Sequence, residues 1–457
     1  MSFADDQTVV HCWETNTGEM TGLQSIMHEP TPRSTRGVDL PSFVTSTLLD
    51  NGEAQGQIDL VFMGDGYTAD ELDAYQHRVD QCIEWIFTVE PFKSYKSKFN
   101  IHRIDVISNE SGVDNDPTRG IDRDTELGMH FWCNDIQRAV CVDFQHTRAL
   151  AEAHLEEADN IIVLGNSTTY GGAASWGSHI ACVTGTDASV RHVVVHELGH
   201  SLGHLADEYT YGGPVNYEGI EPNRANASLY DSASMLDMQS KWYRWLGESV
   251  PGFDGVVGTY EGAVYSSFGI YRPSPNSRMR ASARPFNMPS VEELIYWFYI
   301  DSDGIETPTI FESPELDGHE AAIDVVFNHP TSHDLRVIWN VNQVPIAGAE
   351  RTGFRACEFQ FQPGRHLVTV QAFDDTPWVR DPQIIEQGTT TSRYWFIDIE
   401  TYPADANGDG AINYFDIAFF VNAFLNADPG ADLAEPKGEF DILDITDFIE
   451  RYRTPCP

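Results

Sequence analysis

The sequence predicts a multidomain protein in which an α/β (α+β) domain precedes an all-β sandwich and a small helical tail. Three observations indicate this order. Strand-like and helix-like segments alternate over the first two thirds of the chain, short alternating strands then recur about every ten residues, and an acidic loop leads into an apolar helix near the end. The chain has 457 residues, 41% of them apolar, enough for about two to four domains. We expect an N-terminal segment at 1–50, the α/β domain at 51–302, the sandwich at 303–400 and the tail at 401–457.

The α/β domain begins after residues 1–50, a polar segment that we interpret as a stub of a further domain or a pro-segment. An apolar strand is expected at 58–63, followed by a Gly-Asp-Gly turn. Thr68 then begins a helix, with Glu71 three residues on as a capping box. Further strands at 99–108 and 160–166 extend this βα pattern. They predict a mixed α/β sheet.

Two cysteines of this region, Cys133 and Cys141, lie in "FWCNDIQRAVCVD". They are close enough in sequence to be bridged across a short helix or turn, and two separate buried thiols are the alternative.

Residues 303–400 have a different sequence pattern, with short segments in which apolar and polar residues alternate, such as "DLRVIWNVNQV" and "RHLVTVQAFDD". Turn residues separate these segments at intervals of about ten residues, which is typical of an immunoglobulin-like β-sandwich.

The tail carries an acidic loop, "DANGDGAINYFD", with the spacing of an EF-hand calcium loop. Gly410 occupies the sixth position, where the chain must turn sharply. The residues at the ligand positions 1, 3, 5, 7, 9 and 12 are Asp405, Asn407, Asp409, Ala411 (through its carbonyl), Asn413 and Asp416. In a second copy, Lys437 replaces an acidic ligand and one residue is inserted, so weak calcium binding is expected there.

These two copies in residues 401–457 resemble a dockerin type I module. The resemblance implies a cohesin-like or cell-surface partner. An acidic tail in which calcium serves only stability is the alternative.

The charge balance limits the possible partners of the protein. Its 28 Lys and Arg against 70 Asp and Glu give a net charge of −42, which would repel a nucleic acid backbone. No run of about 18 apolar residues predicts a membrane span. The first residues show no signal peptide, so we expect either that a secretion leader is missing from this sequence or that the protein stays inside the cell.

The stretch "HELGHSLGHLADEY" at 196–209 carries a metal-binding pattern. Residues four apart lie on one face of a helix, so His196 and His200 can bind one zinc ion. Glu197 then lies beside the metal, where it can act as a general base in hydrolysis by metal-activated water.

A third zinc ligand must come from beyond the end of this helix. A straight helix would place later side chains too far away, so we expect Gly203 to adopt a left-handed conformation and turn the chain back. Asp207 is the expected ligand because it lies four residues past Gly203, which leaves enough chain for its side chain to return to the metal. Glu208 is the next candidate, and His204 follows the turn too closely to reach the metal easily.

Five sequence blocks strengthen this interpretation: "VFMGDGYTADE", "KSKFNIHRIDVISNESGVDN", "KWYRWLG", "IYRPSPNSRMR" and "VQAFDDTPWVRDP". Together with "HELGHSLGHLADEY" they resemble the M64 family of metallopeptidases, which is named after a bacterial immunoglobulin A peptidase. The motif also resembles the metzincin form of zinc peptidase, but Ala206 stands where metzincins have their third histidine. The resemblance implies a secreted or cell-surface zinc endopeptidase with His196 and His200 as ligands and Glu197 as base.

The resemblance also assigns roles to two residues downstream. Met279 would lie under the zinc site, as a methionine does in metzincins; a gap-filling core methionine is the alternative. Tyr271 would donate a hydrogen bond to the oxyanion, and a packed surface tyrosine is the alternative. His192 is expected to support a ligand or face solvent. Just before the motif, residues 169–186 are expected to form an edge strand along the substrate cleft or a plain surface hairpin.

We therefore expect a zinc metalloendopeptidase that hydrolyses peptide bonds of proteins, with calcium in the tail. One alternative is a surface-anchored adhesion protein with a peptidase-like fold. The other is a zinc amidase that acts on a non-protein amide.

Overall fold

The computed structural model describes most of the chain, namely residues 41–211, 213–302, 309–310, 321–346, 353–356, 359, 361–399, 402 and 404–453. Most of the expected N-terminal segment, residues 1–40, therefore lies outside the described residues. The chain forms two compact units. The first comprises residues 1–304, 328–334 and 374–389, and the second comprises the rest.

A six-stranded sheet forms the centre of the first unit, with the strand order β1-β3-β2-β4-β6-β5. Its strands are β1 (Thr45–Leu49), β2 (Ile58–Asp65), β3 (Phe99–Ile104), β4 (Asn160–Gly165), β5 (Gly171–Ser175) and β6 (Ile180–Thr184). The four inner strands are parallel, and the two edge strands β1 and β5 run antiparallel to their neighbours. The mixed α/β sheet predicted from the alternating segments is confirmed.

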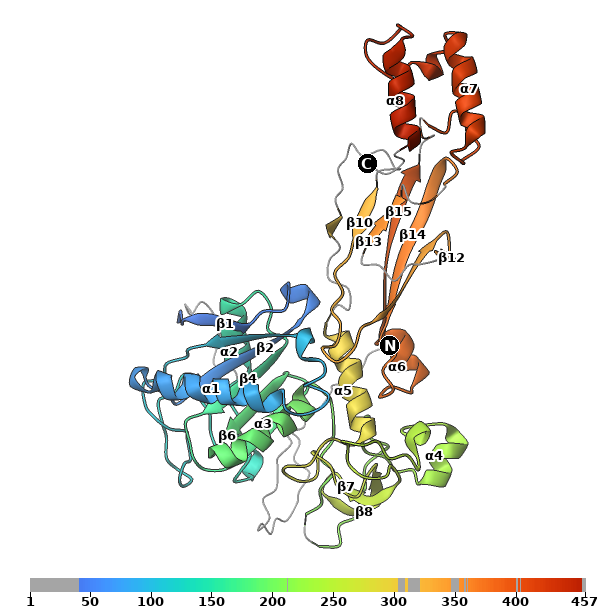
Figure 1. Ribbon diagram of the computed structural model, residues 1–457. Helices are drawn as coiled ribbons and strands as arrows, with labels where there is room; N and C mark the ends of the chain where they lie inside the picture. Colours follow the sequence, from blue (N-terminus) through green and yellow to red (C-terminus); the bar gives the residue numbers. More distant parts are fainter. Residues whose placement is uncertain are drawn as a thin grey trace, which may run out of the picture. The chain divides into compact units, whose positions relative to one another are not determined.

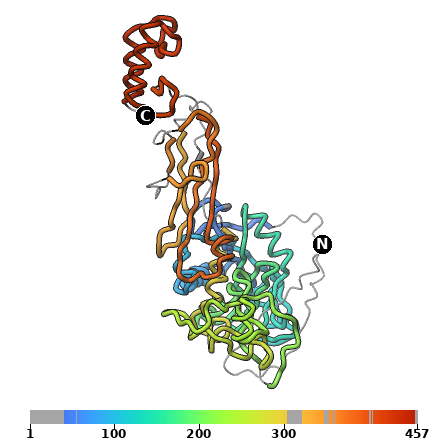
Figure 2. Tube along the Cα trace, turned by 90° about the vertical axis from the view of Figure 1, so that its right-hand side faces the viewer, coloured from blue at the N-terminus to red at the C-terminus, as the bar shows by residue number. Residues whose placement is uncertain are grey.

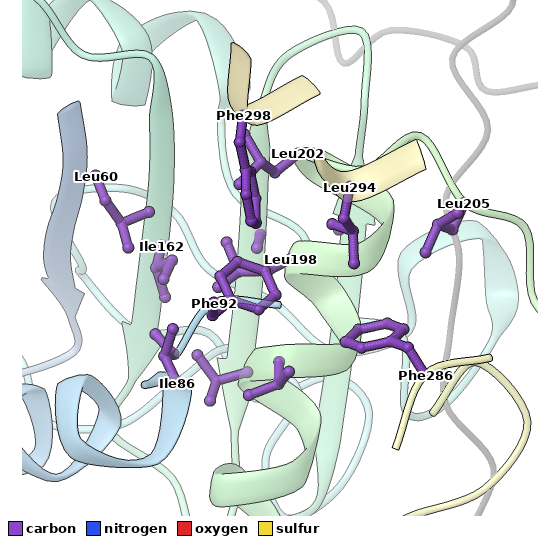
Figure 3. Packing of buried hydrophobic residues seen from close by; sticks show 14 of the residues in the cluster. Leu60, Ile86, Phe92, Ile162, Leu198, Leu202, Leu205, Phe286, Leu294 and Phe298 are labelled. Carbon is purple, nitrogen blue, oxygen red and sulfur yellow. The ribbon is translucent and has the colours of Figure 1, made fainter. Parts of the chain in front are cut away.

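Helices cover both faces of this sheet (Figure 1). Alternate residues of β2 point to opposite faces. Leu60 and Phe62 pack in one core with α1 (Leu72–Ile86), α3 (Asp187–Ser201) and α5 (Met288–Ile300), whereas Val61 and Met63 pack in a second core with α2 (Phe144–His154). In the first core, Leu198 of α3 and Leu202, which directly follows α3, lie among Phe92, Leu294 and Phe298 (Figure 3). The helix that bears the histidine motif is therefore held between the sheet and α5.

The remaining elements of the first unit are short. Thr68 and Glu71 form the predicted capping box ahead of α1. The loop between α3 and α5 contains α4 (Ser232–Met238) and the hairpin of β7 (Tyr260–Ala263) and β8 (Ser266–Arg272). Within the described residues of this unit, short 3-10 turns are Ala54–Gly56, Ala69–Glu71, Lys96–Lys98, Cys133–Asp135 and Tyr243–Trp245, and Pro429–Ala431 is one in the second unit.

Two late segments of the chain, 328–334 and 374–389, belong to this first unit. Asp374 is buried and accepts hydrogen bonds from the hydroxyls of Tyr95 (2.6 Å) and Tyr299 (2.9 Å). The second segment contains α6 (Pro382–Gln387). Parts of the range assigned from sequence to the sandwich are thus built into the α/β unit.

The second unit contains two antiparallel sheets. One has the order β12-β11-β14-β15 and the other the order β13-β10-β9. Their bounds are β9 (Thr309–Ile310), β10 (Ala322–Asp324), β11 (Arg336–Val341), β12 (Val344–Pro345), β13 (Gly353–Arg355), β14 (Gly364–Phe373) and β15 (Thr390–Ile399). Residues of both sheets, among them Ile323, Trp339 and Val370, share one apolar core. The immunoglobulin-like assignment of these strands stays a prediction.

Two helices, α7 (Tyr414–Leu425) and α8 (Ile442–Arg453), follow in the second unit. They lie side by side in both views (Figures 1 and 2). Phe420 and Phe448 stack between them with ring centroids 4.0 Å apart. Among the residues that the structure describes, no helix has the length and apolar character needed to cross a membrane.

Candidate metal centre

The first part of the stretch "HELGHSLGHLADEY", residues 196–201, forms the C-terminal end of α3. His196 and His200 are four residues apart on this helix, and both side chains are fully buried. Their Nε2 atoms lie 3.1 Å from each other. The helical spacing therefore directs two ring nitrogens to the same point, as the sequence predicts.

Hydrogen bonds fix the protonation of these rings. His196 Nδ1 lies 3.0 Å from the carbonyl of Arg278, and His200 Nδ1 lies 2.7 Å from that of Leu205. A carbonyl can only accept, so each Nδ1 carries a proton, and in the neutral form of the ring the Nε2 lone pair then faces the other histidine. Burial also lowers the pKa of His196 to about 4, which keeps this ring neutral.

The chain reverses direction directly after α3. Leu205 N–H donates to the carbonyl of Gly199 and His204 N–H donates to that of His200, so carbonyls of the last helical turn close the reversal. His204 is the left-handed residue of this turn, with a φ of 52°.

The expectation that Gly203 supplies the left-handed conformation is therefore wrong. Position 203 needs glycine for a different reason. A Cβ atom there would lie 2.5 Å from Leu294 Cδ2 on α5 and 2.9 Å from the Gly199 carbonyl oxygen. Close packing of the turn against α5, and not backbone conformation, requires this residue.

After the turn, Asp207 returns to the two histidines. Its Oδ1 atom lies 3.1 Å from His196 Nε2 and 3.2 Å from His200 Nε2. These three buried side chains form a group able to hold a metal ion. The Asp207 side chain is held in place by Tyr265, whose hydroxyl donates to Oδ2 at 2.6 Å.

The structure places the two alternative ligands elsewhere. Glu208 is fully buried, and its carboxylate accepts hydrogen bonds from Asn226 (3.0 Å), Ser277 (2.7 Å) and Asn287 (2.8 Å). It therefore anchors the returning loop to the segment before α5. The ring of His204 stacks on Trp176, with centroids 4.0 Å apart.

Glu197 lies one residue beyond His196 and is also fully buried. Among the described residues, neither of its carboxylate oxygens has a hydrogen-bond partner. Burial raises the pKa of Glu197 well above its usual value, Asp207 raises it further and Arg138 lowers it. A Cβ atom on Gly172 of β5 would lie 2.6 Å from Glu197 Oε1, so only glycine leaves room for this carboxylate.

A loop closed by a disulfide covers β5. Cys133 and Cys141 are joined, with 5.7 Å between their Cα atoms, so the structure contains the bridge that their spacing predicts. Within this loop the carbonyl of Arg138 accepts the backbone N–H of Gly172 at 3.1 Å. The stretch expected as an edge strand or surface hairpin is β5 and β6, and both strands are buried. The surface alternative is wrong, and the Gly172 N–H is already used within the chain.

The other residues singled out from sequence lie at different places around this centre. Met279 packs against α3 between the two histidines, because a Cβ atom on Gly199 would lie 2.7 Å from its sulfur. Tyr271 is in β8, where its backbone pairs with Ser228. The ring nitrogens of His192 lie 3.0 Å from Arg191 Nε and 3.3 Å from Arg278 Nη1, and His192 is not part of the metal-binding group.

Three residues of the centre were not identified from sequence. Tyr265 orients Asp207 by a hydrogen bond. The carbonyl of Arg278 accepts a hydrogen bond from His196 Nδ1. The side-chain amide of Asn226 accepts the N–H of Ala206 and donates to the Ala206 carbonyl, both at 2.8 Å. All three come from loops 20 to 82 residues away from their partners. No local spacing pattern marks such contacts.

The acidic loop of the tail precedes α7. The Asp405 carboxylate accepts the N–H groups of Asp409 and Gly410, and the Asp416 carboxylate accepts those of Asn407 and Asn413. Gly410 has a φ of 82°, as the sharp turn at the sixth position requires. The other expected ligands, Asn407, Asp409, Ala411 and Asn413, all lie in this loop.

Two histidine nitrogens and one carboxylate oxygen, converging beside a buried glutamate, form a candidate metal centre of the kind found in metallopeptidases. Residues 46–254 match the family model described as IgA Peptidase M64, so this part of the chain is similar to that peptidase family. The matched range includes all four of these residues and ends before Tyr265 and Met279. No curated protein was found to match the chain.

Proposed function

We propose that the protein is a zinc-dependent metalloendopeptidase in which His196, His200 and Asp207 bind the metal and Glu197 is the general base. The similarity of residues 46–254 to the M64 family supports the peptidase class. The proposal extends this class to zinc, to the ligand set and to protein substrates.

The separation of the three acceptor atoms carries the proposal. His196 Nε2, His200 Nε2 and Asp207 Oδ1 are 3.1 to 3.2 Å apart. Ligand atoms about 2.0–2.1 Å from a tetrahedral zinc ion are about 3.3 Å apart. Three lone pairs facing one another at this distance repel unless a cation lies between them. Neutral imidazole and carboxylate are ligands that suit zinc.

Each residue then has a separate task in hydrolysis. The bound metal would polarise the scissile carbonyl and lower the pKa of water. Glu197 accepts the proton of the attacking water and delivers it to the leaving amine. Tyr265 holds the Asp207 carboxylate so that Oδ1 faces the histidines. The carbonyls of Arg278 and Leu205 hold the two rings in the tautomer that leaves Nε2 free of a proton.

The test combines metal analysis with cleavage of an unfolded protein. The purified protein is expected to contain about one equivalent of zinc and to produce fragments, whereas Glu197→Gln is expected to retain zinc and lose cleavage by at least about 100-fold. Glu208→Gln is unsuitable as a control, because Glu208 anchors the loop; Glu156→Gln, at an exposed position, is the matched one. Absence of zinc would favour a binding protein with a peptidase-like fold. Zinc without cleavage of any protein would favour an amidase for another amide.

We further propose that the tail binds calcium and attaches the enzyme to a cohesin-like or cell-surface partner outside the cell. Its second loop copy repeats the arrangement of the first. The Asp444 carboxylate accepts the N–H groups of Leu433, Ala434 and Asp441. Apolar side chains of α7 are exposed, among them Phe415 (68%) and Leu425 (76%), which supports a docking role. The Cys133–Cys141 disulfide supports an oxidising location. Binding of the full chain to a cohesin domain, with and without a calcium chelator, tests this proposal.

A further inference from the structure

A second group of acidic residues lies at the amino-terminal ends of the central strands. Asp59 is in β2, Asp159 directly precedes β4, and Glu157 is in the loop after α2. One carboxylate oxygen from each of the three lies within 4.8 Å of the others. Two oxygens that share one calcium ion at about 2.3–2.6 Å can be up to about 5 Å apart. The three residues therefore meet the distance requirement of a single site.

Asp59 has an oxygen that the protein leaves unsatisfied. Its side chain is 2% exposed. Its Oδ1 atom is 2.6 Å from His102 Nε2 and 3.4 Å from Asn100 Nδ2, whereas its Oδ2 atom is buried without a hydrogen-bond partner among the described residues. Leaving a buried carboxylate oxygen unpaired is costly. A bound cation would remove that cost.

Asp159 is held next to Asp59 by the backbone. Its Oδ2 atom accepts the Asp59 N–H at 2.7 Å, and its own N–H donates to the Asp59 carbonyl at 3.1 Å. The second oxygen of Asp159 and both oxygens of Glu157 then remain for a cation. The two aspartates cannot move apart without breaking these two hydrogen bonds, which join the start of β2 to the start of β4.

Positive charge near these carboxylates is limited. Arg148 is the nearby guanidinium, but its hydrogen bonds go to the carbonyls of Ala158 and Ser178. Among the described residues, no Lys or Arg forms an ion pair with any of the three carboxylates. Burial, together with repulsion from Asp59, Glu157 and Asp301, raises the pKa of Asp159 to about 7, although the hydrogen bond from the Asp59 N–H lowers it.

We propose that Asp59, Glu157 and Asp159 form a structural calcium site at the start of β2 and β4. Three carboxylates and no nitrogen or sulfur ligand suit a hard divalent cation. Calcium is favoured over magnesium because these oxygens come from a strand, a strand entry and a loop, an irregular set that calcium accepts and octahedral magnesium does not. Water completes the coordination on the side of the half-buried Glu157 and Asp159.

The site would also support the metal-centre helix. Asn160, the neighbour of Asp159, accepts the hydroxyl of Ser201 at 3.0 Å, and Ser201 follows His200 on α3. Calcium at the entry of β4 would hold Asn160 in place and so stabilise the end of α3. The inference does not depend on peptidase activity.

Counting bound calcium in the full chain tests the proposal, because the tail loops also bind this ion if they function as expected. Equilibrium dialysis against ⁴⁵Ca is run on the zinc-loaded protein, on Glu157→Gln/Asp159→Asn, and on the single-charge control Glu156→Gln at an exposed neighbouring position. The cluster variant is expected to bind one calcium fewer than the wild type, and the control the same number as the wild type. Equal binding by all three proteins overturns the site.

A tail variant keeps the test decisive if the cluster variant does not fold. Asp405, Asp416, Asp432 and Asp444 are changed to Ala, which leaves the first unit unchanged in sequence. This variant must still bind one calcium, and its thermal unfolding temperature must rise with calcium. Binding of none overturns the proposal, as does displacement of the ion by an equal concentration of magnesium.

Discussion

Gly199 of α3 lies directly against Met279, so that a Cβ atom at position 199 would be 2.7 Å from the methionine sulfur. Gly199 lies between His196 and His200 in the sequence of the helix. Met279 directly follows Arg278, whose carbonyl accepts a hydrogen bond from His196 Nδ1. The Met279 carbonyl in turn accepts the N–H of Glu208 at 2.8 Å. A single packing contact therefore links the helix to the loop that carries Asp207.

Gly199→Ala is expected to displace Met279 and lower the free energy of unfolding by roughly 1–3 kcal/mol, the usual cost of overpacking a core. Zinc affinity should fall as well, because the loop that supports His196 and Asp207 moves with Met279. Thermal unfolding and competition with a zinc chelator measure the two effects. In Met279→Ala the space is free, so adding Gly199→Ala to that variant should cost much less. Additive losses in this double-mutant cycle would show that the contact is unimportant.

Tyr265→Phe removes the hydroxyl that donates to Asp207 Oδ2. Loss of such an orienting hydrogen bond is expected to weaken zinc binding about 10- to 100-fold, with little change in the unfolding temperature of the zinc-free protein. Tyr271→Phe is the matched control and should bind zinc like the wild type. If Tyr271→Phe weakens zinc binding and Tyr265→Phe does not, the assignment of the two tyrosines is reversed.

Lys98 predicts a pH dependence of stability. It is fully buried, with its Nζ 3.6 Å from the centre of the Tyr299 ring, and burial lowers its pKa from 10.5 to about 7. The unfolded chain therefore holds this proton more tightly than the folded chain between pH 7 and about 10.5. Stability from this group rises with pH across that window, and its cost is largest below pH 7.

Lys98→Met is accordingly expected to stabilise the protein near pH 6, by roughly 1–4 kcal/mol at about 1.4 kcal/mol per pKa unit. The gain should shrink toward pH 10. Chemical denaturation at several pH values measures it, with Lys93→Met, at an exposed position, as the control. A difference between Lys98→Met and wild type that stays constant from pH 6 to pH 10 contradicts the prediction.

The Cys133–Cys141 bridge closes a loop with a sequence separation of 8 residues. Replacing both cysteines by serine is expected to lower the free energy of unfolding by about 2–3 kcal/mol. Peptidase activity should fall with it, because the loop holds Gly172, which lies against Glu197. Treating the wild type with a reductant should reproduce both effects, and Cys82→Ser should remain sensitive to the reductant. Unchanged activity would separate the loop from the metal centre.

The parts of the centre that could be predicted from sequence depend on local spacing. Helical periodicity alone brings His196 and His200 together, and counting residues past the turn favoured Asp207. The same local reasoning assigned the wrong conformation to Gly203, because its partner Leu294 is about 90 residues away and no spacing rule reveals that contact. Tyr265 was missed for the same reason, since it reaches Asp207 only through the tertiary fold.

The fold follows the same division. Alternating apolar segments predict the mixed α/β sheet, and four residues predict the capping box at Thr68. The return of residues 328–334 and 374–389 to the first unit could not be predicted, because it depends on single distant contacts such as Asp374 with Tyr95.

That return has a practical consequence for anyone who shortens the gene. Stopping translation near residue 303 would delete Asn328, which donates to the Gly56 carbonyl, and Asp374, the shared acceptor of Tyr95 and Tyr299. Such a fragment would expose two buried phenols and lose the Asn328 carbonyl that accepts a hydrogen bond from Lys98. The first unit therefore does not end with α5. Recombinant versions of this unit must include the chain at least through residue 389.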